Sequence, residues 1–198
     1  AVGIHPENID ENWSNALEAV KELARHEPKV CAIGEIGLDY YWEKEERARA
    51  RQQVVFARQM ELARELGKPV IVHDRDAHGD CMEITRRYPD VTGVYHCYAG
   101  SVEMARELLK LGYYLSFTGV ITFKNARKAL EVIRETPIDR LMIETDSPYM
   151  APEPYRGRRN SSLYVHRMAE TIAAVKGMDA AEVEGITTEN GKRLFGIS

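Results

Sequence analysis

Short apolar runs alternate with amphipathic stretches along the whole chain. Six apolar runs are short and rich in β-branched residues, which is typical of buried strands, and they cover residues 1–5, 30–37, 69–74, 92–98, 114–119 and 141–146. Apolar residues recur at helical spacing over residues 11–26, 44–66, 78–87, 102–111, 125–135, 161–176 and 179–195. Because strands and helices alternate, with no run of strands alone, the pattern predicts parallel βαβ units.

Two parallel architectures fit this alternation, an open doubly wound sheet and a (β/α) barrel. No Gly-x-Gly-x-x-Gly follows any strand-like run, which weakens the dinucleotide-binding form of the open sheet. Residues able to bind a metal close four separate runs, whereas an open sheet gathers its site at one switch point. We therefore predict an α/β fold with a distorted TIM-like (β/α) barrel, formed as a single domain over residues 1–198.

The barrel is expected to be incomplete. A closed barrel of this kind has eight strands, and the pattern supplies six of them. The chain also begins at Ala1 inside an apolar strand-like run, although the first residues of a domain are usually exposed. We expect the two remaining strands to precede Ala1, so that the domain is N-terminally truncated.

Composition and charge mainly exclude classes of protein. The net charge of −4 argues against a surface coated in basic charge for duplex binding, but it leaves a local basic patch open. No apolar run approaches the roughly 18 residues of a membrane span, and the chain opens with no signal segment. The three cysteines lack metal-binding or paired spacing, which favours reduced thiols. We expect a cytoplasmic monomer or weak oligomer without membrane association.

Four residues that can bind a divalent metal each close a different strand-like run, and they are Glu35, His73, His96 and Asp146. The C-terminal ends of parallel strands converge on one face, where catalytic groups gather. Carboxylates are hard oxygen ligands, and imidazole suits zinc and other first-row metals. A single strand-end histidine would more simply be a hydrogen-bonded rim residue. The four together favour a metal centre, often with two ions (Mg, Mn or Zn) bridged by a carboxylate.

The segments around these residues carry a resemblance to a known family. Residues 34–41 read Gly-Glu-Ile-Gly-Leu-Asp-Tyr-Tyr, and residues 144–149 read Glu-Thr-Asp-Ser-Pro-Tyr. Together with residues 3–6, 72–77, 96–101 and 190–195 they resemble the signatures of the TatD family of metal-dependent deoxyribonucleases. The family's fold is the distorted barrel of the metal-dependent hydrolase superfamily. The matching segments run in order from one end of the chain to the other.

The resemblance implies hydrolysis of DNA phosphodiester bonds, commonly as a 3′-to-5′ exonuclease on single strands or DNA ends. It implies that Glu35 bridges two divalent ions and that His73 and His96 bind one of them. Asp146 would complete the ligand set and accept a proton from the attacking water, which makes Asp146 and Glu35 the catalytic candidates.

The chain departs from the family pattern at one place. The family opens with a His-x-His pair on its first strand, which supplies two further metal ligands, and no His-x-His occurs in this sequence. The missing pair falls within the two strands expected before Ala1. Without this pair the first metal site of the family would lose half of its protein ligands.

Substrate contacts are expected from three regions near these ligands. His5, at the end of the first run, is expected to face the substrate phosphate, with a structural rim histidine as the rival interpretation. Tyr40 and Tyr41 crowd the loop after Glu35, with Trp42 beside them, where they would stack on unpaired bases or simply pack over the rim. Three loop arginines are expected to hold phosphates rather than only solvate the loop: Arg156, Arg158 and Arg159.

Four further acidic residues are expected to orient the metal ligands or the loop next to them. Asp74 and Asp76 follow His73 and could orient a ligand imidazole, although a solvated loop or a helix cap fits them nearly as well. Glu144 could do the same or be hydrogen-bonded beside its strand. Asp39 is expected to hold the loop after Glu35 by accepting backbone N–H groups.

Two other functions stay open at this point. Related barrels use similar metal sets to hydrolyse small amides or esters, and ligand identity alone does not separate a phosphate from a carbonyl substrate. The aromatic and arginine-rich loops favour nucleic acid. A truncated or degenerate chain could also be inactive and act only as a binding partner, in which case divalent ions would bind weakly.

Overall fold

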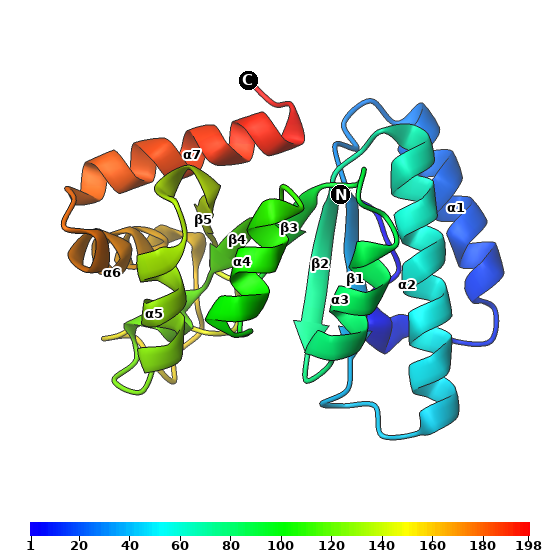
Figure 1. The fold of residues 1–198 in the computed structure, drawn as a ribbon, viewed down its shortest axis with the longest axis horizontal. Helices are drawn as coiled ribbons and strands as arrows, with labels where there is room; N and C mark the ends of the chain where they lie inside the picture. Colours follow the sequence, from blue (N-terminus) through cyan, green and yellow to red (C-terminus); the bar gives the residue numbers. More distant parts are fainter. The chain divides into compact units, whose positions relative to one another are not determined.

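The computed structural model describes all 198 residues, which form two compact units (Figure 1). The first unit contains residues 1–96 and 195–197, and the second contains residues 97–194 and 198. Among the helices, none combines the length and the apolar character that a membrane span requires.

The first unit is built on a parallel sheet in which β1 (Ile33–Asp39) pairs with β2 (Val70–Arg75) and β2 pairs with β3 (Gly93–Tyr95). Three helices connect and cover these strands: α1 (Trp13–His26), α2 (Glu46–Leu66) and α3 (His78–Arg86). Helix α2 packs on β1, and α1 packs on the side of α2 that faces away from the sheet (Figure 1). Helix α3 packs against both β1 and β2.

The core of the first unit lies between α2 and the sheet. Val55, Phe56, Met60 and Ala63 form one stripe of α2 and are completely buried, as the helical spacing of apolar residues predicts. The helix ends at Gly67, whose left-handed φ of 60° lets its N–H bond to the carbonyls of the last turn. The short connection that follows delivers the chain directly into β2.

The second unit pairs β4 (Tyr114–Phe117) with β5 (Leu141–Ile143) in parallel. Its helices are α4 (Val102–Lys110), α5 (Arg127–Glu135), α6 (His166–Lys176) and α7 (Ala180–Phe195). Helix α4 packs on β4 and α5, and α5 packs on α6. Buried Asn190 of α7 donates to the carbonyls of Ile138 and Leu141, so α7 is tied to the start of β5.

Each helix expected from the apolar spacing forms, and so do five of the six expected strands. The expectation of a strand over residues 1–5 is wrong, because this segment makes only an isolated bridge between Val2 and Ile33. The reason is a side chain that replaces a strand partner. Gln59 of α2 accepts from the N–H of Ile4 at 2.6 Å and donates to its carbonyl at 3.1 Å, and Pro6 then ends any further pairing. The single-domain expectation stays a prediction.

Gly93 offers a test of how tightly β2 and β3 pair. An added Cβ would lie 2.1 Å from the carbonyl oxygen of Val70, which is backbone and cannot rotate away. We expect Gly93→Ala to lower the free energy of unfolding by about 2 kcal/mol or more, as measured by urea denaturation. Gly185→Ala in α7 is the control, because its Cβ would meet no atom within 4 Å and the free energy should rise by up to about 1 kcal/mol. Equal effects of the two changes would contradict this account of the sheet.

Candidate metal centre

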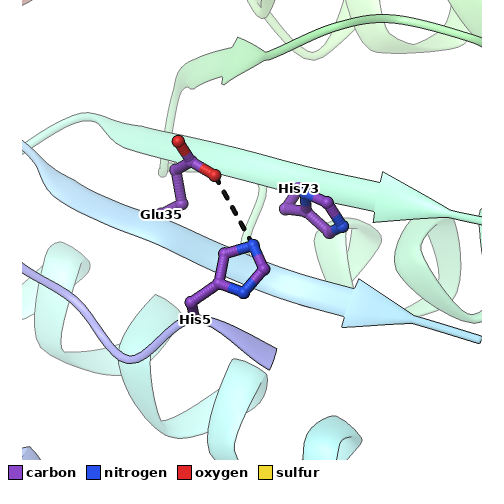
Figure 2. Close-up of side chains that lie close together, drawn as sticks. All are labelled: His5, Glu35 and His73. Atoms are coloured by element: carbon purple, nitrogen blue, oxygen red, sulfur yellow. Dashed lines mark ion pairs between the residues drawn. The ribbon is translucent and has the colours of Figure 1, made fainter. Parts of the chain in front are cut away.

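Three side chains from different elements of the first unit point toward one another. Figure 2 shows His5 from the N-terminal segment, Glu35 from β1 and His73 from β2, and their ligand atoms all lie within 4.8 Å of one another. His96 follows β3 and joins them, with its Nε2 atom 3.2 Å from Nδ1 of His73 and 3.3 Å from Oε2 of Glu35. Parallel pairing brings these residues together because the three strands end on the same side of the sheet.

A bulge in β1 aims the carboxylate of Glu35. Gly34 pairs with Ile71 and Ile36 pairs with Val72, so Glu35 is an extra residue with no partner in β2. Its neighbours are buried, whereas the side chain of Glu35 is 40% exposed. A bulge re-aims a side chain without breaking the strand, and here it takes the carboxylate out of the core and toward the histidines.

The close contact of β1 with β2 also depends on Gly37. Its φ is +134°, and an added Cβ would lie 2.0 Å from the carbonyl oxygen of His73. Only glycine fits this position, because it has no Cβ and tolerates positive φ. The two strands can therefore approach closely where Gly37 pairs with His73.

Asp39 orients His73. Its Oδ2 atom lies 3.0 Å from Nε2 of His73, and its Oδ1 atom accepts the backbone N–H groups of Tyr41 and Trp42 at 3.0 and 2.9 Å. Burial raises the pKa of Asp39, but the hydrogen bonds from Trp42 and His73 outweigh it and the pKa is lowered. Burial lowers the pKa of His73, which keeps the ring neutral. A neutral ring that donates from Nε2 to Asp39 carries its lone pair on Nδ1, the nitrogen that faces His96.

The contacts between His96 and its neighbours follow from that tautomer. Since Nδ1 of His73 is an acceptor, Nε2 of His96 must be the donor, and its N–H lies between Nδ1 of His73 and the carboxylate of Glu35. This hydrogen bond from His96 is the main cause that lowers the pKa of Glu35 to about 2, while burial opposes it and the nearby histidines add to it. Glu35 is therefore ionised and close to two ring nitrogens throughout the neutral pH range.

Two separations among the three donor atoms have the length expected for ligands to one small cation. A tetrahedral ion with bonds of about 2.05 Å keeps neighbouring ligand atoms about 3.3 Å apart. The separations of 3.2 Å from His73 to His96 and 3.3 Å from His96 to Glu35 match that value. A cation would take the place of the proton on Nε2 of His96. Nδ1 of His73, Nε2 of His96 and Oε2 of Glu35 therefore fit a divalent metal.

His5 makes contacts that differ from those of the other three residues. Its Nδ1 atom accepts the backbone N–H of Glu7 at 3.3 Å, which caps the 3₁₀ turn Pro6–Asn8. The neutral ring then carries its proton on Nε2, which faces Oε2 of Glu35 at 3.6 Å. Nε2 of His5 can therefore donate a hydrogen bond at the edge of the centre, and, like Nε2 of His96, it can also exchange its proton for a cation.

Two buried glutamines position His5, and the sequence analysis missed both. Gln59 bonds to the N–H and carbonyl of Ile4, and Gln52 donates to the carbonyl of Pro6 at 3.2 Å while it accepts the N–H of Asp39 at 3.0 Å. They lie seven residues apart on the apolar face of α2, which is the signal that could have found them. The segment that carries His5 is thus held on both sides by side-chain amides.

The acidic residues predicted to orient the ligands have different partners in the structure. Asp74 accepts from Nδ1 of His78 at 2.9 Å, so its partner is the first residue of α3. Asp76 is exposed at a positive φ of 56° after β2. In the second unit, Glu144 accepts the N–H of Cys97 and the hydroxyl of Ser116, each at 2.6 Å, and so holds the residue that directly follows His96 in the sequence.

Asp146 belongs to the second unit and has a left-handed φ of 53°. Asn160, nearly fully buried, donates to the carbonyls of Thr145 and Tyr149 at 2.6 and 2.7 Å, which fixes the backbone on both sides of Asp146. The three predicted phosphate-binding arginines of the following loop are exposed, and the guanidinium of Arg156 lies 4.3 Å from the ring centre of Phe123. They are Arg156, Arg158 and Arg159.

The two tyrosines predicted to contact substrate have different surroundings in the structure. The hydroxyl of Tyr40 donates to Asp80 at 2.7 Å and accepts from Gln53 at 2.7 Å, and its ring lies beneath the guanidinium of Arg49. Tyr40 is thereby built into the contact between α2 and α3. Tyr41 is exposed in the same loop.

Comparison with known proteins places the chain among metal-dependent hydrolases. The profile of the TatD related DNase family matches residues 1–196. The uncharacterized metal-dependent hydrolase YabD of Bacillus subtilis is 48% identical over 200 residues, which cover all of this chain and 77% of YabD. The uncharacterized metal-dependent hydrolase YcfH of Escherichia coli K12 is 44% identical over 197 residues, which cover 98% of this chain and 72% of YcfH.

A solved structure supports the same relationship. The crystal structure of YJJV, a TatD homolog from Escherichia coli, superimposes with a TM-score of 0.89 at 30% identity, over all of this chain and 76% of that one. The expected α/β class with a TIM-like relationship is confirmed by this similarity.

The proposed donor set predicts which histidines control metal affinity. We expect His73→Ala to weaken the binding of Zn²⁺ or Mn²⁺ by about 100-fold or more in titration calorimetry, because one of three donors is lost. His26→Ala is the matched control, since this exposed ring on α1 pairs with Glu22 and its loss should leave the affinity unchanged. A His73→Ala protein that binds as tightly as the parent would exclude this centre.

Substitution of Asp39 should lower metal affinity less than loss of a donor, because Asp39 acts only through His73. Asparagine has one acceptor oxygen where aspartate has two, so Asp39→Asn cannot accept from both His73 and the loop N–H groups. We expect metal affinity to fall about 10- to 100-fold while circular dichroism stays that of the parent. Asp90→Asn, at an exposed position, is the control. An unchanged affinity in Asp39→Asn would mean that the carboxylate does not orient His73.

Proposed function

Because the chain belongs to the TatD related DNase family and is a metal-dependent hydrolase, we propose that it hydrolyses phosphodiester bonds of DNA. The proposed mode is 3′-to-5′ exonucleolytic cleavage of single strands or DNA ends. The observation that carries the proposal is the cluster of Glu35, His73 and His96, whose donor atoms have the spacing of ligands to one cation.

The proposed centre holds two divalent ions, with Mg²⁺, Mn²⁺ or Zn²⁺ as candidates. Bound ions of this kind acidify water and offset charge on a phosphate. Glu35 is ionised and half-exposed, so its carboxylate is free to turn a second oxygen toward a neighbouring ion. His73 and His96 present ring nitrogens to the same point, and Asp39 keeps His73 in the tautomer that does so.

Asp146 is proposed as the general base and a further ligand. The support for it is the segment Glu144 to Tyr149, which resembles the family motif. Asn160 bonds to backbone carbonyls on both sides of this residue, so the backbone that carries the carboxylate is held in place. A carboxylate is a suitable acceptor for the proton that water loses as it attacks phosphorus.

His5 is proposed to bind the substrate phosphate. Its Nε2–H points to the centre and its ring is held by the turn that follows, so it can donate to a non-bridging oxygen without reorganisation. Negative charge grows on these oxygens during attack, which makes such a hydrogen bond stronger in the transition state. The exposed arginines of the 148–162 loop are proposed to contact neighbouring phosphates.

The proposal is tested by the hydrolysis of 5′-labelled single-stranded DNA with added Mg²⁺ or Mn²⁺. We expect products that shorten progressively from the 3′ end, loss of activity in EDTA, and a loss of about 100-fold or more in Glu35→Ala and Asp146→Ala. Glu22→Ala, an exposed glutamate on α1, is the control and should cleave as the parent does.

Two outcomes would contradict the proposal. Equal cleavage by Glu35→Ala and the parent would show that the metal centre does not take part in hydrolysis. Hydrolysis of small ester or amide substrates with no cleavage of DNA would favour the other class of metal-dependent hydrolase. Because the match covers 77% of YabD, the assay is run on the 198-residue chain and on the same chain joined to the rest of YabD.

A further inference from the structure

Tyr41 and Trp42 form an exposed aromatic pair directly after β1. The side chains are 44% and 64% exposed, and their rings meet edge to face with centres 4.8 Å apart. Large aromatic surfaces are costly to leave in water, and soluble proteins seldom expose them side by side without a use. The pair therefore calls for an explanation beyond packing.

Cationic groups surround this pair. The guanidinium of Arg75, at the end of β2, lies 4.0 Å from the ring centre of Tyr41 and 5.7 Å from that of Trp42. The ammonium of Lys44 lies 5.6 Å from the ring centre of Tyr41. Arg75 and the two rings are called the aromatic platform below. Aromatic faces with adjacent positive charge are the usual surface for unpaired nucleic acid.

The loop that bears the platform is held in place. Oδ1 of Asp39 accepts the N–H groups of both Tyr41 and Trp42, and Lys44 donates to the carbonyl of Tyr40 at 2.7 Å. A preorganised aromatic surface loses little conformational entropy when a ligand stacks on it. The platform is thus a built surface rather than a pair of mobile side chains.

A hollow of about 230 Å³ adjoins Trp42. It is lined by residues of the N-terminal segment, the loop after β1 and α2, namely Pro6, Glu7, Ile9, Trp42, Glu43, Ala48 and Gln52. The carboxylates of Glu7 and Glu43 would repel a phosphate there. The hollow is therefore suited to a flat neutral group, such as a nucleobase, with the charged backbone on the side of Arg75.

The platform stands beside the candidate metal centre. Arg75 follows His73 by two residues in β2, so strand alternation places both on one face of the sheet, about 7 Å apart along the strand. Asp39 touches both regions, with one oxygen on His73 and the other on the platform loop. A DNA strand with one phosphate at the metal centre could lay a neighbouring base on the platform.

We propose that the Tyr41–Trp42–Arg75 platform is a stacking subsite for an unpaired base of a DNA single strand next to the phosphate at the metal centre. This inference rests on the proposed function, and it makes the platform the element that selects single strands. A base paired in a duplex has no free face to offer, whereas an unpaired base of any identity can stack.

The experiment measures binding separately from cleavage. Trp13→Phe leaves Trp42 as the remaining tryptophan, and its fluorescence is followed in EDTA as a short oligo-deoxythymidylate is added. We expect saturable quenching with this probe, and at least about fivefold weaker binding to an abasic strand of equal length and to a blunt duplex.

Substitutions at Trp42 separate stacking from general apolar contact. In a fluorescently labelled oligonucleotide assay, Trp42→Phe keeps an aromatic face and should bind within about twofold of the parent. Trp42→Leu keeps the apolar volume alone and should bind at least about fivefold more weakly, as should Arg75→Lys, which loses the planar group. Equal affinity of Trp42→Leu and the parent, or of the abasic and normal strands, would overturn the inference.

A different result would contradict the proposed function. Base-dependent binding without hydrolysis at any metal concentration would support the stacking subsite and contradict the nuclease proposal. Hydrolysis with an unchanged KM in Trp42→Leu would support the nuclease proposal and contradict the stacking subsite. If both hold, Trp42→Leu raises KM for single-stranded DNA by about fivefold or more with kcat changed less.

Discussion

The carboxylate of Asp39 is completely buried, and both the candidate metal centre and the proposed aromatic platform depend on it. A buried charge is costly unless hydrogen bonds replace its lost hydration. Here one oxygen accepts from His73 and the other accepts two backbone N–H groups, which is why the pKa of the carboxyl stays low despite burial. The same charge therefore sets the tautomer of His73, a proposed metal ligand, and the shape of the loop beside it. Neither part can shift without disturbing the other.

A second constraint is the way α2 holds the N-terminal segment. The buried side chains of Gln52 and Gln59 bond to the backbone at Pro6 and Ile4, where a strand partner would otherwise be needed. Buried amides of this kind are stable only when all their hydrogen-bonding groups are satisfied, so they specify one position for the segment. His5 lies between the two tied residues. Its placement at the candidate metal centre thus depends on helix α2 as well as on the bridge between Val2 and β1.

The chemistry of the centre follows from proton positions as much as from ligand types. His73 presents a lone pair because Asp39 holds its proton, and His96 presents an N–H to two acceptors. His5 presents an N–H because the turn after it occupies the other nitrogen. Within one cluster, Nδ1 of His73 is thus a ready lone pair, whereas Nε2 of His96 and Nε2 of His5 each carry a proton that a cation would have to replace. The fold alone would not assign these roles, because similar barrels support many reactions.

Apolar periodicity was enough to predict the order of helices and strands, since the spacing of buried residues is a local property of each segment. It also singled out Glu35, His73 and His96, although Glu35 and His73 lie within β1 and β2 rather than at their ends. Residues far apart in sequence decided the rest. The register of β1 against β2 made Asp39, and not the adjacent Asp74 or Asp76, the partner of His73. The bulge at Glu35 and the amide contacts from α2 likewise need the packed neighbour to exist, and no local pattern encodes a neighbour's position.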